Sequence, residues 1–175
     1  MIVNFCGEGC FKIQTSGGTT ILTEGFGDTS ARMKPDIFIR TSENKTNLTA
    51  EHVILGPGEY EIKGIEVRGY PSYIYLIRTE EMKLGYLGPN DIKEPAFDAA
   101  VTEKLQDVDI LFVPDSAEGA KAARQFHPHI VVSQSVTAKD LEKELGKKTE
   151  TVDKLVIKKK EVPTEEVGRL IVLKP

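Results

Sequence analysis

The stretch Gly56 to Ile65, GPGEYEIKGI, decides how this sequence is interpreted. Two runs rich in β-forming residues, 59–62 and 65–70, flank Lys63-Gly64, which is the pattern of a β-hairpin. The glycines that open the stretch are not followed by the Lys-Ser/Thr of a phosphate-binding loop, and they do not lead into a helical pattern. The stretch therefore predicts a turn followed by a hairpin.

Further short strands are predicted on both sides of this hairpin, throughout the first half of the chain. Ser16-Gly17-Gly18 is typical of a turn between two strands, and Thr79-Glu80-Glu81 marks a third hairpin. The β-branched and aromatic residues predict strands over 2–6, 10–15, 20–24, 36–40, 53–55, 59–62, 65–70, 73–78 and 82–87.

The second half of the chain alternates between strand and helix patterns. Ser116 is expected to cap the second of three helices, and Thr137-x-x-Asp140 resembles a capping box for the third, which Gly146 should end. Hairpins followed by this alternation predict an α/β (α+β) fold with two sheets and helices outside them. The helices are predicted over 96–105, 117–126 and 137–145, and the strands over 108–113, 130–132, 155–157 and 170–173.

Length and composition are those of an ordinary globular domain. The chain has 175 residues and a net charge of -4, which gives no reason to expect nucleic acid or an anionic membrane as a partner. Without a linker or repeat, residues 1–175 are expected to form a single domain. Cys6 and Cys10 are too few for a disulfide framework, and no signal peptide is visible, so a reduced, cytoplasmic setting is expected.

The residues taken on their own indicate no catalytic set. His127-Pro128-His129 lies between a predicted helix and a predicted strand, without a carboxylate or thiol near it, and is interpreted as an exposed turn. His52 precedes a strand and is interpreted as a surface or cap residue. Glu8, Glu24 and Asp28 lie near strand ends and leave open a carboxylate pair, which sequence spacing alone does not establish.

The order of segments resembles the metallo-β-lactamase superfamily, in particular its small prokaryotic branch of zinc-dependent hydrolases. Residues 56–65 are similar to the Pro-Gly-Glu-Tyr-Glu-x-x-Gly-(Val/Ile) hairpin of that branch, which is the most specific match. Residues 7–13 resemble its opening Gly-His-x-Cys-Phe-x-Ile hairpin, with Glu8 in place of the histidine. The resemblance covers nearly the whole chain and implies a four-layer αββα sandwich of metallo-β-lactamase type.

The same resemblance implies zinc ligands at positions where this sequence has other residues. The family motif Ser/Thr-His-x-His-x-Asp-His corresponds here to residues 41–47, TSENKTN. Hydroxyl and carboxamide groups are neutral and are weak ligands for zinc. The histidines are replaced by Ser42, Asn44 and Asn47, and the aspartate is replaced by Thr46.

The remaining ligand positions follow this pattern. Tyr86-Leu87-Gly88-Pro89 is similar to His-Leu-Gly-Asp, with Pro89 in place of the aspartate that bridges two metals. Residues 130–135 are similar to Ile-Val-Ile-Pro-Met-His, with Ser135 in place of the histidine. Pro71-Ser72-Tyr73 runs directly into the next strand, where the family has a histidine and a loop.

Zinc is the cofactor that the family implies, but no bound cofactor is expected here. The vestigial pocket would comprise Ser42, Asn44, Thr46, Asn47, Pro89 and Ser135.

The sequence leaves two functions open. In the first, the chain is a non-catalytic binding or assembly protein whose partner is unknown. Because the missing loop would expose hairpin edges, a homo-oligomer is consistent with this hypothesis. In the second, the chain is a hydrolase with a rebuilt carboxylate or single-metal site. The carboxylates that could build such a site are Glu8, Glu24, Glu43 and Asp91.

Overall fold

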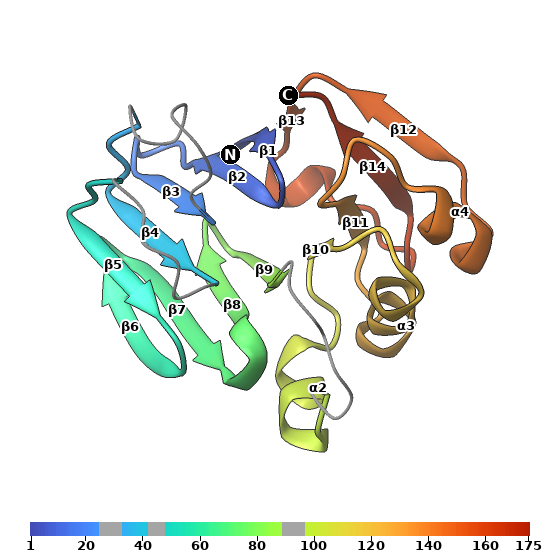
Figure 1. Cartoon of the computed structure of the whole chain (residues 1–175), viewed down its shortest axis with the longest axis horizontal. Helices are drawn as coiled ribbons and strands as arrows, with labels where there is room; N and C mark the ends of the chain where they lie inside the picture. Colours follow the sequence, from blue (N-terminus) through green and yellow to red (C-terminus); the bar gives the residue numbers. More distant parts are fainter. Residues whose placement is uncertain (25–32, 42–47, 89–96) are drawn as a thin grey trace.

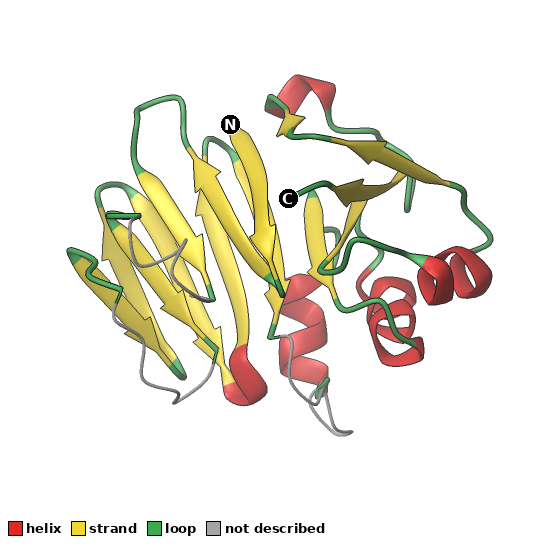
Figure 2. Ribbon diagram, turned by 45° about the horizontal axis from the view of Figure 1, so that its top comes forward, coloured by secondary structure: helices red, strands yellow, loops and turns green. Residues whose placement is uncertain are grey.

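Two mixed β-sheets lie face to face in this computed structural model (Figure 1), which describes residues 1–24, 33–41, 48–88 and 97–175. The first sheet, here called sheet A, has six strands and is formed mainly by the N-terminal part of the chain. The second, sheet B, has eight strands from the middle and the C-terminal part. Figure 2 shows the two sheets as separate layers, with helices beside the C-terminal strands.

Sheet A is antiparallel on one side and parallel on the other. Its strands are β1 (Ile2–Gly7), β2 (Cys10–Gln14), β3 (Thr20–Thr23), β4 (Ile37–Arg40), β5 (His52–Leu55) and β13 (Leu155–Val156). They are arranged in the order β13-β1-β2-β3-β4-β5. The pairs from β13 to β3 are antiparallel, whereas β3 pairs with β4 and β4 with β5 in parallel.

Sheet B begins with the hairpin of residues 56–65 that the sequence predicts. Its strands are β6 (Gly58–Ile62), β7 (Ile65–Tyr70), β8 (Ile74–Thr79), β9 (Met82–Leu87), β10 (Ile110–Val113), β11 (Ile130–Ser133), β12 (Thr149–Val152) and β14 (Arg169–Leu173). They are arranged in the order β12-β14-β11-β10-β9-β8-β7-β6. The hairpins β6–β9 are antiparallel and the other pairs are parallel.

The main hydrophobic core fills the space between the two sheets. Alternate side chains of each strand point inward, as the two-residue period of a strand requires. Phe11 of β2 lies with its ring centroid 5.2 Å from that of Phe5 and 4.7 Å from that of Phe112, on sheet B. Every residue of β10 is buried, because sheet A covers one face of this strand and helices cover the other.

Three α-helices pack against the outer face of sheet B. They are α2 (Ala99–Leu105), α3 (Ala117–Phe126) and α4 (Lys139–Leu145). As predicted, the Ser116 side chain caps α3 by accepting a hydrogen bond from the Gly119 backbone N–H at 3.1 Å, and Gly146 ends α4. None of these three α-helices packs on sheet A, and within the described ranges no helix is long and apolar enough to span a membrane.

In this half of the chain one sequence prediction was wrong and one strand was missed. Thr137 does not cap α4, because the Asp115 carboxylate, from the loop after β10, accepts the Lys139, Asp140 and Leu141 backbone N–H groups at 3.0–3.2 Å. The capping group therefore comes from a distant loop instead of from the helix's own sequence. The strand β12 was not predicted, because its residues are polar and partly exposed and carry no apolar run.

A polar cluster joins the two sheets at the turn of the β6–β7 hairpin. Lys63 of that turn contacts Asp36, which precedes β4, and Glu51, which precedes β5, at 2.6 Å each. Asp36 also accepts hydrogen bonds from the Thr20 backbone N–H at 2.8 Å and hydroxyl at 2.9 Å. Lys63, and then Thr20, lower the pKa of Asp36 from 3.8 to about 2.

This cluster predicts how stability changes in acid. Because the pKa of Asp36 is lower in the folded chain, its contribution to stability is complete above about pH 4. That contribution should fall as the pH drops toward 2 and the carboxyl takes up a proton. Urea unfolding at a series of pH values should therefore give a stability difference between wild type and Asp36→Asn that shrinks across this window. Glu61→Gln, at an exposed carboxylate of the same hairpin, is the matched control and should leave the acid limb unchanged. A constant difference for Asp36→Asn would contradict the prediction.

Candidate functional site

The ends of four strands from both sheets meet in one region, here called the strand-end site. Thr41 follows β4 and packs against Gly88, which follows β9. A Cβ added to Gly88 would lie 3.4 Å from the Thr41 Cβ and 3.0 Å from the Tyr73 Cβ, so a larger residue would have to push these neighbours away. The backbone N–H of Gly88 donates to the Tyr73 carbonyl at 3.0 Å. Gln134, after β11, donates from Nε2 to the Leu87 carbonyl. The contacts thus run continuously from sheet A to sheet B.

Glu24 holds the sheet A side of this site. Its backbone N–H donates to the Ile39 carbonyl at 2.9 Å, and its carboxylate Oε2 accepts the Thr41 backbone N–H at 3.2 Å. Glu24 has a φ of 44°, in the left-handed region that non-glycine residues seldom adopt. The carboxylate therefore fixes the start of the segment that follows β4.

Two buried tyrosines lie beneath the strand ends and bridge the sheets. The Tyr75 hydroxyl donates to the Arg40 carbonyl at 2.8 Å and accepts the Gly56 backbone N–H at 3.0 Å. The Tyr86 hydroxyl donates to the Gly9 carbonyl at 2.8 Å, and the Thr23 hydroxyl donates to the same carbonyl at 3.3 Å. Both rings belong to sheet B, and the groups that they bond at Arg40 and Gly9 belong to sheet A.

Burial keeps these two phenols neutral. It raises the pKa of Tyr75 to about 12, and it raises the pKa of Tyr86 well above 10, with a further increase from the Glu24 charge. Both hydroxyl groups therefore remain proton donors across the physiological pH range. In this position they act as hydrogen-bonding bridges between backbone groups.

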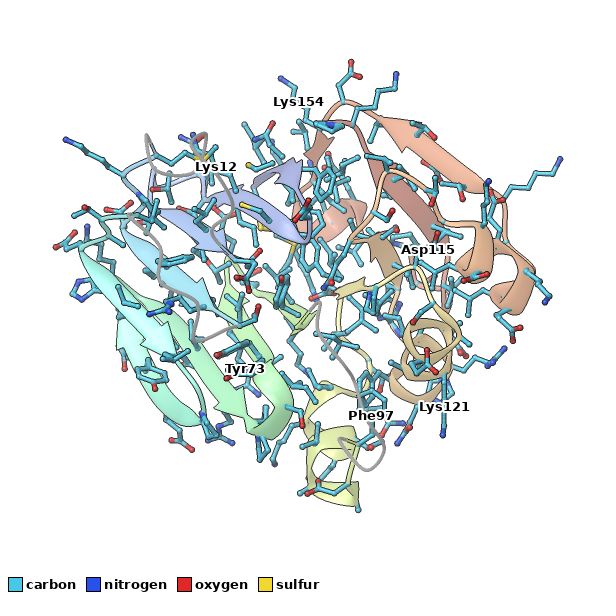
Figure 3. All side chains as sticks on the ribbon, viewed as in Figure 1. Lys12, Tyr73, Phe97, Asp115, Lys121 and Lys154 are labelled. Carbon is cyan, nitrogen blue, oxygen red and sulfur yellow. The ribbon has the colours of Figure 1, made fainter. Side chains whose placement is uncertain are left out.

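Ser135 lies on a loop held by neighbouring side chains at the end of β11. Its backbone N–H donates to the Ser133 Oγ at 3.2 Å, and its own Oγ accepts the Thr137 backbone N–H at 3.4 Å. Asp115, labelled in Figure 3 beside α4, accepts the Thr137 hydroxyl at 2.8 Å in addition to capping that helix. The sequence offered no signal for this role of Asp115 beyond an acidic residue after a strand.

The structure brings Glu8 and Glu24, two of the proposed carboxylates, to the same end of sheet A. Glu8 lies exposed in the turn between β1 and β2, and the hydrogen bond from Thr23 to the Gly9 carbonyl joins that turn to the end of β3. The other predicted site residues lie outside the described residues; they are Ser42, Glu43, Asn44, Thr46, Asn47, Pro89 and Asp91.

The histidines do not lie at the strand-end site. His127 and His129 precede β11, whereas Ser135 follows it, and a four-residue strand spans roughly 13 Å. His127 contacts Glu166 at 2.9 Å, and His52, at the start of β5, lies 3.7 Å from Glu51. Across the described residues, no group of three or more His, Cys, Asp or Glu side chains is arranged to hold a metal ion.

Two buried polar atoms at the strand-end site lack a partner among the described residues. They are the Thr41 Oγ1, on a residue that is 1% exposed, and the Gln134 Oε1, on a residue that is 6% exposed. An unsatisfied buried polar group costs about 1–3 kcal/mol, so such groups are uncommon in folded proteins. The only sequence signal for them is a polar residue that directly follows an apolar strand.

Solved structures provide the fold-level comparison. A Thermotoga maritima protein, proposed to be a Zn-dependent hydrolase of the metallo-β-lactamase superfamily, matches with a TM-score of 0.80 and 19% identity over 98% of this chain and 97% of that chain. YhfI from Bacillus subtilis, a metallo-β-lactamase fold protein, matches with a TM-score of 0.58 and 10% identity over 99% and 96%. The metallo hydrolase Igni18 from Ignicoccus hospitalis matches with a TM-score of 0.56 and 12% identity over 78% and 83%. No protein-family model and no curated protein matches the sequence.

The chain therefore has the metallo-β-lactamase fold, an αββα-type sandwich built on two mixed sheets. The match to the Thermotoga protein extends over nearly the full length of both chains. The predicted resemblance to the small Zn-dependent hydrolases is confirmed at the level of the fold.

The bridge made by Tyr75 leads to a prediction on stability. Tyr75→Phe should lower the free energy of unfolding by about 1–3 kcal/mol, because it removes the hydrogen bonds that join the buried Tyr75 hydroxyl to the Arg40 carbonyl and to the Gly56 backbone N–H. Tyr70→Phe is the matched control, since the buried Tyr70 hydroxyl has no partner among the described residues. Its effect should stay within about 0.5 kcal/mol or be stabilising. Equal losses in urea unfolding of both variants would refute the assignment.

Proposed function

We propose that this chain is a non-catalytic metallo-β-lactamase-fold protein that binds its ligand or partner without zinc, and that residues 1–175 act as one domain. The main support is the chemistry of the groups gathered at the strand ends. Thr41 and Ser135 offer hydroxyl oxygens and Gln134 offers a carboxamide, while the Glu24 carboxylate is engaged by the Thr41 backbone N–H.

These groups do not fit a zinc ion. Zinc in proteins is bound by thiolates, imidazoles and carboxylates, three or four of which must converge. Apart from the Glu24 carboxylate, the groups named at the described strand ends are neutral, and the sequence has Ser42, Asn44 and Asn47 where the family resemblance implies histidines.

A neutral polar ligand suits this site better than an anion or a cation. The Gln134 Oε1 can only accept a hydrogen bond, whereas the Thr41 hydroxyl can both donate and accept one. A ligand that supplies a donor to Gln134 and a partner to Thr41 would satisfy both buried atoms and recover the free energy that they cost unpaired. No buried cation or free metal is required for that recognition.

Assembly with a second copy stays a prediction, and β5 is the surface that supports it. This strand is an edge of sheet A, and its Val53 and Leu55 side chains are 52% and 42% exposed. An unpaired strand edge with apolar side chains favours association.

Elemental analysis tests the absence of zinc. Protein expressed in zinc-supplemented medium and purified without chelators should contain less than about one tenth of an equivalent of zinc or manganese. Its melting temperature should not change with EDTA or added zinc. A metal ion that binds only the folded state would raise the melting temperature. A stoichiometric metal content in the wild-type protein would contradict the proposal.

A variant with restored ligands is the matched control for that measurement. It carries Ser42→His, Asn44→His, Thr46→Asp, Asn47→His, Pro89→Asp and Ser135→His, and it should take up zinc if the lost side chains are the reason that wild type does not. Failure of this variant to bind zinc while remaining folded would show that the strand ends lack the geometry as well as the ligands.

The alternative is a hydrolase with a rebuilt carboxylate site, and the shared location of Glu8 and Glu24 is the observation that favours it. Calorimetric titration with Mn²⁺ separates the two functions. We expect no saturable binding to wild type and no change in Glu8→Gln, an exposed position where the fold should tolerate the substitution. Saturable binding to wild type that Glu8→Gln weakens at least about tenfold would establish the alternative.

A further inference from the structure

The two cysteines of the chain lie opposite each other on the β1–β2 hairpin. The register pairs Asn4 with Lys12 and Gly7 with Cys10, with a bulge between Phe5 and Gly7. In a bulge two residues of one strand oppose one residue of the other, so Cys6 and Gly7 together face Cys10. Phe5 and Phe11 point into the core, and the alternation along both strands therefore turns Cys6 and Cys10 to the outer face of sheet A.

The turn between the two cysteines keeps the strands close. Gly7, Glu8 and Gly9 have φ values of 102°, 44° and 76°, which form a tight left-handed turn that the two glycines make accessible. The turn is anchored from the other sheet by the Tyr86 hydroxyl on the Gly9 carbonyl. This anchored turn holds the Cys6 and Cys10 side chains next to each other on the outer face of sheet A.

The two thiols differ in environment. Cys10 is buried with Leu22, Phe38 and Leu48, whereas Cys6 is half-buried at the edge of that cluster and is open to solvent. The hydrogen bond from Cys10, with the backbone N–H and the charge of Lys12, lowers the pKa of Cys6 to about 7 in spite of burial. Lys12 is labelled on β2 in Figure 3. An accessible thiolate beside a protected second thiol is the arrangement of a reactive cysteine with its resolving partner.

We propose that Cys6 and Cys10 form a redox-reactive dithiol, which low-molecular-weight disulfides convert into an intrachain disulfide. The Cys6 thiolate attacks a disulfide RSSR, forming a mixed disulfide Cys6–S–SR and releasing RS⁻. The Cys10 thiol then loses its proton, attacks the Cys6 sulfur and releases the second RS⁻. Together the two cysteines lose two electrons and two protons, and RSSR is reduced to two RSH.

This modification is independent of whether the strand-end site binds a metal or a ligand. The Cys6–Cys10 disulfide would close a covalent ring around the β1–β2 turn. The Gly9 carbonyl of this turn accepts hydrogen bonds from the Tyr86 and Thr23 hydroxyls. The oxidised form would therefore fix the hairpin turn that borders the strand-end site.

Mass spectrometry of the full-length chain tests the proposal with oxidised glutathione as the probe. Trypsin releases residues 1–12 as one peptide that contains both cysteines, the only two of the chain. At neutral pH, this peptide should become lighter by two hydrogen atoms and regain them with dithiothreitol. Cys10→Ser should stop at the mixed disulfide and gain the mass of one glutathione. Cys6→Ser should react at least about tenfold more slowly, because only the buried thiol is left.

A measurement on the wild-type chain tests the proposal without substitutions, so it does not depend on whether the variants fold. With less than one equivalent of iodoacetamide, tandem mass spectrometry of the same peptide should find the label on Cys6. Labelling in urea, where both thiols are exposed, is the control and should distribute between the two cysteines. Preferential labelling of Cys10, equal rates for both single variants, a lasting mixed disulfide in wild type, or covalent dimers would each overturn the proposal.

Discussion

The packing of two apolar sheet faces against each other is the constraint on which the rest of this structure depends. Phe11 of sheet A lies between Phe5 and Phe112, and Tyr86 lies with its ring centroid 6.2 Å from that of Phe112. Because each strand must present its apolar residues to this core, the register of every pair is fixed and a shift by one residue would expose them. The positions of the strand ends, and hence of all candidate site groups, follow from this packing.

Hydrogen bonds from buried neutral groups hold the strand ends together at the edge of that core. Tyr75 and Tyr86 each place a hydroxyl from sheet B on a carbonyl of sheet A, and Gln134 bonds the Leu87 carbonyl within sheet B. Neutral donors satisfy backbone groups without the desolvation penalty of a buried charge. This arrangement accounts for how a fold shared with metal-dependent hydrolases can keep its strand ends in place with hydroxyl and amide groups.

Much of the fold was predictable because it depends on local sequence. The hairpins at Ser16-Gly17-Gly18 and Lys63-Gly64 were found from turn residues, and the cap of α3 from Ser116. The cap of α4 was not, because Asp115 is remote in sequence and reaches the helix only after β10 and β11 have paired. The same limit applies to the site: the sequence named Glu24 as an acidic residue near a strand end but not its bond to Thr41.

The sequence by itself determined which donor atoms this protein can offer. It has three histidines and two cysteines, and the positions where the family resemblance implies zinc ligands hold hydroxyl or carboxamide groups and, at Pro89, a proline. Only the tertiary structure decided which of these groups meet. The proximity of Cys6 to Cys10 requires β1 and β2 to pair in their observed register, and the contact of Thr41 with Gly88 requires two sheets to pack. Residue identity is local, whereas proximity is set by strand register and by packing between distant segments.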